Sequence, residues 1–254
     1  MTMTIAVAGK GGTGKTTFAA LLIKYIRVRN LGYILAIDGD PSANLNLVLG
    51  MELPDTVGHI REDTRIQVST GRYDSSIPKA DFFEYRIHES LVEGDRIDLI
   101  AMGRPEGPGC YCAANSILRN VIDRLGNQYD FVVIDNEAGM EHISRQTTRD
   151  VDKLFIVTDM TMRGIVAAGH IVSLIRELGT RVHETYLVIN RVNGDIPAPM
   201  KQEIERLGLH LIGTLPQDRT IAEFDLIGKP LIEIREESPI YKAVAEIAAK
   251  TGIR

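Results

Sequence analysis

The fold of this chain is decided by the stretch Gly9-Lys10-Gly11-Gly12-Thr13-Gly14-Lys15-Thr16. It follows the apolar run 5–8 and leads into the largely apolar segment 17–23, so that it joins a strand to a helix. The spacing G-x-x-x-x-G-K-T in this context is the phosphate-binding loop. Its glycines let backbone N–H groups surround an anion, and the positive end of the following helix adds to the same site. The stretch therefore predicts a nucleoside triphosphate site.

Within this loop the side chains have distinct expected roles. Lys15 should reach the β- and γ-phosphate oxygens, and the Thr16 hydroxyl should ligate Mg²⁺. A glycine-rich turn without special chemistry would not be expected to match every position between a strand and a helix. The expected cofactors are ATP or ADP with Mg²⁺, bound by Gly9, Lys10, Gly11, Gly12, Thr13, Gly14, Lys15, Thr16 and Thr17.

Composition narrows the class of protein. The chain has 254 residues, 44% of them hydrophobic, which fits one large α/β domain spanning 1–254. Its net charge of −5, without a basic cluster, argues against general affinity for nucleic acid. No apolar stretch is long enough for a membrane span, and the N-terminus runs directly into the first strand. Two cysteines one residue apart exclude a disulfide framework, so a cytoplasmic location is expected.

Apolar runs alternate with helical patterns along most of the chain. This alternation predicts an α/β fold of the P-loop NTPase type, a mostly parallel sheet with helices on both faces in a single domain. Residues 51–96 are the least regular part and are expected to form a solvated surface region, helical at most over 81–92. The expected strands are 33–38, 96–102, 131–135, 153–158, 184–191 and the start of 210–218; the expected helices are 116–125, 162–178, 200–207, 219–226 and 239–251.

Acidic residues follow two of the expected strands. Asp38 and Asp40, separated by a flexible glycine, come at the end of 33–38, and Asp135 ends 131–135. Open α/β sheets bind ligands at the carboxyl ends of their strands, so these carboxylates are expected to face one polar site. Asp135 occupies the position where a carboxylate holds Mg²⁺ directly or through water. For Asp38 and Asp40, a structural turn with solvated carboxylates is the alternative.

A cysteine pair lies in a Gly/Pro-rich loop before the expected helix 116–125. Cys110 and Cys112 would face the same side of an extended segment, but two thiolates do not complete a metal site. Two chains around a two-fold axis would supply four thiolates. A tetrahedral arrangement suits zinc, and a square-planar one suits nickel or copper(II). Two small cysteines without a ligand, or a redox pair, are the alternatives.

The motif K-G-G-T-G-K-T, with Lys10 after the first glycine, resembles the deviant Walker A family. That family includes the nitrogenase iron protein and the cell-division and plasmid-partitioning ATPases. The cysteine pair, taken with the run N-E-A-G-M-E-H-I-S-R at 136–145, resembles the nickel-insertion ATPases that mature carbon monoxide dehydrogenase. This resemblance implies that Lys10, Lys15 and Asp40 are catalytic. Lys10 would touch the phosphate bound by the other subunit, Asp40 would orient or deprotonate the attacking water, and Asp38 would lie near the Mg²⁺ shell.

The same resemblance supplies the remaining sites and partners. It places Asn190 with Arg191 against the adenine, together with the turn containing Pro216 and Asp218. It implies that nickel, or zinc, binds at Cys110 and Cys112 and bridges a homodimer that depends on nucleotide and metal. Glu141 and His142 are interpreted as surface or interface residues rather than as metal ligands. The implied client is apo carbon monoxide dehydrogenase, with no nucleic acid and no membrane.

Two other classes of ATPase stay open. An iron-protein-like electron-transfer ATPase would carry a bridging iron–sulfur cluster, but 136–145 contains no cysteine to be its second ligand. A positioning or partitioning ATPase would need affinity for lipid or DNA, which the acidic charge does not favour. The final helix also argues against a membrane-binding tail, because its apolar stripe resembles a core-packing face: Ile240, Val244, Ile247 and Ala248.

Overall fold

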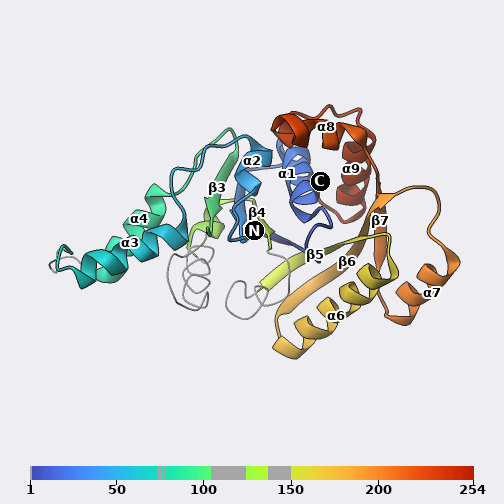
Figure 1. Cartoon of the computed structure of the whole chain (residues 1–254), viewed down its shortest axis with the longest axis horizontal. Helices are drawn as coiled ribbons and strands as arrows, with labels where there is room; N and C mark the ends of the chain where they lie inside the picture. Colours follow the sequence, from blue (N-terminus) through green and yellow to red (C-terminus); the bar gives the residue numbers. More distant parts are fainter. Residues whose placement is uncertain (1, 74–75, 77, 104–123, 137–149) are drawn as a thin grey trace.

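The structure is a computed structural model that describes residues 2–73, 76, 78–103, 124–136 and 150–254. The seven strands within these ranges form one sheet in the order β3-β2-β4-β1-β5-β6-β7, with every neighbouring pair parallel (Figure 1). The expected α/β architecture is confirmed. The strands are β1 (Met3–Ala8), β2 (Ile34–Asp38), β3 (Ile97–Ala101), β4 (Phe131–Asp135), β5 (Asp150–Asp159), β6 (Arg181–Val192) and β7 (Leu211–Pro216).

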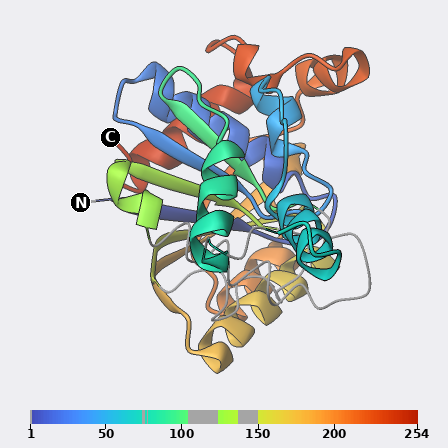
Figure 2. The same cartoon turned by 90° about the vertical axis from the view of Figure 1, so that its left-hand side faces the viewer.

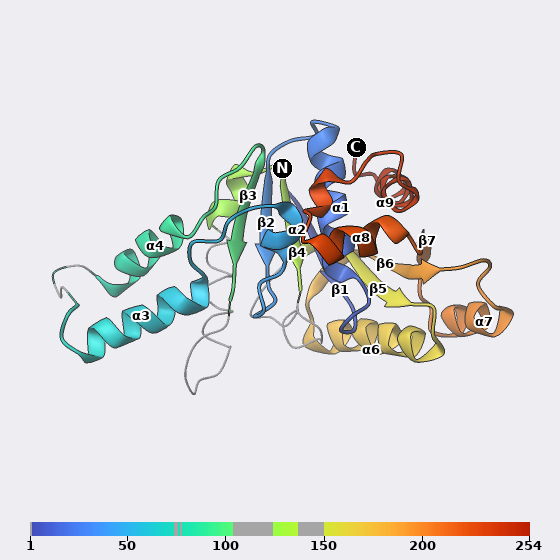
Figure 3. The same cartoon turned by 45° about the horizontal axis from the view of Figure 1, so that its top comes forward.

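Helices cover both faces of this sheet (Figures 1 and 3). One face carries α1 (Lys15–Val28), α8 (Arg219–Ile227) and α9 (Pro239–Lys250). On the other face α6 (Met162–Leu178) and α7 (Ala198–Arg206) lie over β5, β6 and β7. The other described helical elements are α2 (Leu45–Leu49), α3 (Val57–Ser69), α4 (Lys79–Glu89), η1 (Gly126–Gln128) and η3 (Leu231–Glu233).

The main core lies between the sheet and the layer of α1 and α9. Phe155 on β5 is fully buried there, with its ring centroid 5.1 Å from that of Phe18 on α1 and 5.5 Å from that of Tyr186 on β6. The central strands are buried on both faces because parallel strands are covered by helices on each side, which explains their continuous apolar runs. The stripe expected on the last helix is buried here: Ile240, Val244, Ile247 and Ala248.

The expectation for residues 51–96 was correct for a helix near 81–92, which overlaps α4, but it missed the helix α3. Instead of an irregular surface region, the chain forms α3 and α4, which lie side by side and project from the body (Figures 1 and 2). Thr56 caps α3 by accepting the His59 N–H at 3.3 Å. Val57, Ile60 and Ile87 are buried at the base, whereas most of α3 beyond Ile60 is not, which explains the weak apolar signal.

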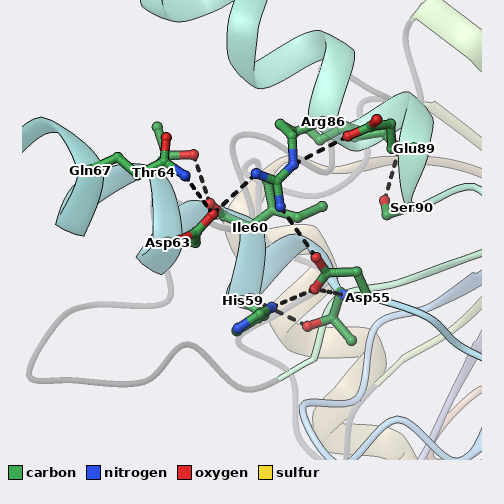
Figure 4. A network of polar contacts seen from close by, with 11 residues as sticks. Asp55, His59, Ile60, Asp63, Thr64, Gln67, Arg86, Glu89 and Ser90 are labelled. Atoms are coloured by element: carbon green, nitrogen blue, oxygen red, sulfur yellow. Dashed lines mark hydrogen bonds and ion pairs between the residues drawn. The ribbon is translucent and has the colours of Figure 1, made fainter. Parts of the chain in front are cut away.

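Polar contacts hold α3 and α4 together (Figure 4). The Arg86 guanidinium on α4 pairs with Asp63 on α3 at 3.1 Å, with Asp55 before α3 at 3.6 Å and with Glu89 at 3.3 Å. The Nδ1 atom of His59 lies 2.7 Å from Asp55 Oδ1. Because Asp63 lies 23 positions before Arg86 in the chain, no local sequence pattern indicates the pairing.

The base of α3 is also hydrogen-bonded to the sheet. The Gly58 N–H donates to the Met102 carbonyl at 2.7 Å, and the Met102 N–H donates to the Asp38 carbonyl at 2.8 Å. Two backbone hydrogen bonds therefore join the first turn of α3 to the end of β2. In the described ranges, none of the helices has the length and apolar character needed to cross a bilayer.

Replacing the central aromatic ring should destabilise the fold strongly. Phe155→Ala should lower the free energy of unfolding by about 3–5 kcal/mol, because it removes a fully buried ring and leaves a cavity. Leu226→Ala is the matched control, since Leu226 is 86% exposed on α8 and its loss should cost less than about 0.5 kcal/mol. Urea unfolding of both variants measures the difference; equal losses would contradict this account of the core.

Candidate nucleotide-binding and catalytic site

The loop between β1 and α1 lies against the ends of other strands. A Cβ atom on Gly9 would come within 2.1 Å of the Val157 carbonyl oxygen on β5, and one on Gly14 within 2.2 Å of Asn190 Nδ2 on β6. Both glycines also have positive φ angles, 149° and 92°, which other residues rarely adopt. The glycines predicted from the motif are therefore required by the folded loop itself.

The loop is closed by hydrogen bonds around one carbonyl group. The Lys10 carbonyl accepts from the Thr13 hydroxyl at 2.8 Å and from the Thr13 N–H at 3.4 Å, and Lys15 Nζ lies 3.5 Å from the same oxygen. Lys15 is buried while Lys10 is exposed. The N-terminus of α1 begins at Gly14 with no side-chain cap and no acidic residue in its first turn. Its N–H groups and positive dipole thus suit an anion.

Asp38 organises the segment that follows β2. Its Oδ1 accepts the Asp40 N–H at 3.0 Å, and its Oδ2 accepts the Leu45 N–H at 2.8 Å. Burial raises the pKa of Asp38 to about 6, against the lowering effect of these hydrogen bonds. The half-buried Asp40 accepts the Ser42 N–H at 2.8 Å through Oδ1. The segment 39–45 is thus folded around the Asp38 carboxylate.

Asp135 lies beside Asp38 and fits a magnesium site. The two residues are paired in register on the neighbouring strands β4 and β2. Burial raises the pKa of Asp135 to about 7, the Asp38 charge adds to the shift, and the Thr16 side chain and the Lys15 charge oppose it. Asp135 Oδ1 is buried and has no hydrogen-bond partner among the described residues. A buried carboxylate oxygen without a donor, close to a hydroxyl group, suits a cation that prefers oxygen ligands.

Asn136 contributes to the site although it was not among the predicted site residues. Its side-chain Nδ2 donates to the Val7 carbonyl at 3.0 Å, and its backbone N–H donates to the same oxygen at 3.0 Å. It is buried, and it ties the end of β4 to the end of β1. An asparagine directly after an apolar strand was the available signal, but its partner lies far away in the sequence.

The residues expected to contact the adenine make internal hydrogen bonds. Asn190 donates from Nδ2 to the Thr13 carbonyl at 2.8 Å, and its Oδ1 accepts the Arg191 N–H at 2.8 Å. Asp218 begins α8, where it accepts the Thr220 N–H at 2.9 Å, and it also accepts the Ser238 hydroxyl at 2.7 Å. Partial burial would raise the pKa of Asp218, but hydrogen bonds from Ser238 and Thr220 outweigh it and leave that pKa below its usual value.

Pro216 and Arg191 lie at neighbouring strand ends. Pro216 ends β7 and pairs with Val192 on β6, next to the exposed Arg191. Their predicted contact with the base remains a prediction.

The predicted nickel ligands Cys110 and Cys112 lie outside the residues that the structure describes, as do Glu141 and His142. Most of the expected helix 116–125 lies there too. Across the described ranges, no three His, Cys, Asp or Glu side chains come together in a way that could hold a metal ion. The nickel site therefore stays a prediction from the sequence.

The arrangement defines a class of protein. A phosphate-binding loop, an uncapped helix N-terminus and two buried carboxylates meet at the carboxyl ends of β1, β2 and β4 in a parallel sheet. This is the nucleotide site of a P-loop ATPase.

Comparison with known proteins identifies the family. The model of the CobQ/CobB/MinD/ParA nucleotide-binding domain matches residues 4–231, and the chain belongs to this family of ATPases. The chain is 45% identical to an uncharacterised ATP-binding protein of Methanocaldococcus jannaschii over 248 residues, 98% of each chain. It is 30% identical to the carbon monoxide dehydrogenase accessory protein CooC of Rhodospirillum rubrum over 241 residues, 89% of this chain and 88% of CooC.

A solved structure agrees with the fold. The septum site-determining protein MinD of Pyrococcus horikoshii, complexed with Mg-ADP, superposes with a TM-score of 0.70 at 23% identity. The alignment covers 98% of this chain and 95% of MinD. At this level of identity the similarity establishes the architecture.

The elevated pKa of Asp135 predicts a pH effect on stability. The carboxyl ionises near 3.8 when exposed and near 7 when folded, so the folded state holds an extra proton between these values. The stabilisation that this extra proton gives is complete below the pKa of the unfolded state. It is lost as the pH rises through the pKa of the folded state. Asp135→Asn cannot ionise, so its stability relative to wild type should rise by on the order of 2 kcal/mol between pH 5 and pH 7.

Urea unfolding without Mg²⁺ and nucleotide measures this effect. Asp95→Asn is the control, because its side chain is 76% exposed and should show no such trend. A stability difference between Asp135→Asn and wild type that is the same at both pH values would contradict the assignment.

Proposed function

We propose that the protein is an ATP-driven metallochaperone that binds nickel and delivers it to apo carbon monoxide dehydrogenase. The observation that carries this proposal is the 30% identity to CooC over 89% of the chain. The sequence adds Cys110 and Cys112, two soft ligands in a chain of the same family. Nickel is the cargo in this scheme, and zinc is the competing occupant of the same thiolates.

In this proposal the described site performs the hydrolysis. The loop N–H groups and Lys15 bind the phosphates, while Thr16 and Asp135 hold Mg²⁺, with Asp38 beside them. The cation, when bound, neutralises charge that develops on the phosphoryl oxygens. Asp40 orients the attacking water, since one of its oxygens accepts the Ser42 N–H and the other has no such bond in the described structure. Asp38 keeps Asp40 in place through its hydrogen bond to the Asp40 N–H.

ATP binding would drive the closure of a homodimer. The exposed Lys10 would reach the phosphates of the partner subunit, so that hydrolysis occurs only in the closed dimer. The same closure would bring Cys110 and Cys112 of each chain together as a four-thiolate nickel site. Hydrolysis then opens the dimer and lowers its hold on the metal.

A positioning or partitioning ATPase is the second candidate function. The family model that matches this chain is named for MinD and ParA as well as for CobQ and CobB, which favours it. Against it stand the net charge of −5 and the packing of the last helix, whose apolar stripe is buried in the core and is not available to a lipid surface.

Nickel titration of the reduced protein tests the metallochaperone. Wild type should bind one Ni²⁺ per two chains, and light scattering should show the mass double as nickel is added. Cys112→Ala should lose both responses, because two remaining thiolates cannot complete the site. His59→Ala is the matched control for adventitious surface binding, since His59 is exposed and should leave the stoichiometry unchanged.

The same titration can reject the proposal. Protein that dimerises with ATP alone and binds no nickel, with or without Cys112→Ala, would support the positioning or partitioning class instead. A brown protein with visible absorbance would support the iron–sulfur alternative.

Mixing two inactive variants tests the role of Lys10. Lys10→Ala should bind ATP but has no lysine to place in the partner subunit's site. Lys15→Ala should not bind ATP but keeps Lys10. If Lys10 acts across the dimer, the mixture should hydrolyse ATP at least tenfold faster than either variant alone, as expected for a charge supplied in trans. A rate equal to the sum of the two separate rates would show that Lys10 acts within its own subunit.

A further inference from the structure

We infer that Asn190 is a positioning residue that holds the phosphate-binding loop in its anion-binding conformation. This assigns it a role toward the phosphates that is separate from its expected contact with the base. The inference concerns ATP binding itself and does not depend on the nickel proposal. It begins from the hydrogen bond between Asn190 Nδ2 and the Thr13 carbonyl, 2.8 Å long and formed by a side chain that is only 4% exposed.

The hydrogen bond between Asn190 and Thr13 spans one strand of the sheet. In the sheet β6 is separated from β1 by β5, so Asn190 reaches the loop across the end of β5. Asn190 is paired in register with Asp159, the last residue of β5, and the Val157 carbonyl lies directly against Gly9. The loop therefore rests on two strand ends, and Asn190 is the side chain that fastens it to the second.

The orientation of the Asn190 amide is fixed by its neighbour. The register between β6 and β7 shifts between Ile189 and Val192, and Arg191 in this irregular stretch has a left-handed φ of 58°. Its N–H donates to Asn190 Oδ1 at 2.8 Å. With the oxygen engaged there, the Nδ2 group is directed at Thr13. A non-glycine residue held in this conformation indicates a local constraint that the surrounding structure maintains.

The held carbonyl sets the direction of the next N–H group. In a trans peptide the C=O and N–H groups point to opposite sides. Because the Thr13 carbonyl points to Asn190, the Gly14 N–H points away from it. A flipped peptide would exchange the two groups and turn an oxygen toward the anion. Thr13 is also held from the other side by its bonds to the Lys10 carbonyl.

The hydrogen bond also explains the glycine at position 14. A Cβ atom there would lie 2.2 Å from Asn190 Nδ2, so the bond can form only with a glycine at this position. The result is a loop whose donors are arranged before the ligand arrives, which reduces the ordering cost of binding. Losing the Asn190 amide should therefore weaken the binding of any triphosphate, with or without a base.

Isothermal titration with two probes, Mg-ATP and Mg-tripolyphosphate, tests this inference. Asn190→Ala should weaken the binding of both by about tenfold, the cost expected for one buried hydrogen bond. Gln202→Ala is the control, because Gln202 is exposed on α7, a helix that carries none of the site residues; it should bind both probes like wild type.

Unchanged tripolyphosphate affinity in Asn190→Ala would overturn the inference, since only a contact to the nucleoside would then have been lost. Asn190→Asp provides a second test if the alanine variant does not fold. It keeps an acceptor for the Arg191 N–H but places an oxygen against the Thr13 carbonyl. It should weaken tripolyphosphate binding at least as much as alanine, and wild-type affinity for this probe would again overturn the inference. Circular dichroism and thermal melting establish that each variant is folded.

Discussion

The phosphate-binding loop lies so close to the ends of β5 and β6 that it has no space for side chains at Gly9 and Gly14. This close approach is the constraint on which the site depends. It keeps side chains out of the loop at these two positions, and it lets one asparagine from β6 fix the direction of a peptide group. The parallel order of the strands makes this possible, because it places the ends of β1, β5 and β6 at the same edge of the sheet.

Burying two carboxylates side by side raises the free energy of the protein without its ligands. Asp38 offsets part of this cost with two backbone hydrogen bonds, whereas Asp135 keeps an oxygen without a partner among the described residues. The two acids therefore differ in function although both end buried strands. Asp38 shapes the backbone, and Asp135 is the residue whose buried, unpartnered oxygen suits a cation.

Sequence patterns were sufficient for the parts of the fold that repeat. The phosphate loop, the parallel sheet and α6 at 162–178 were predicted correctly, because buried parallel strands and amphipathic helices have strong local signals. The hairpin of α3 and α4 was missed, since its polar contacts to Arg86 join distant segments and few of its residues are buried. The bond from Asn190 to Thr13 could not be foreseen either, because it spans 177 positions of the chain.

The hairpin has a mechanical consequence for the rest of the molecule. Its two helices are held rigid against each other by Arg86, and its first turn is joined to β2 through Met102 by two consecutive backbone hydrogen bonds. The backbone of Asp38, at the nucleotide site, thus lies at the attached end of two helices that project from the body. A small rotation of the hairpin about this attachment would move the far ends of α3 and α4 much further than it moves the residues beside Asp38.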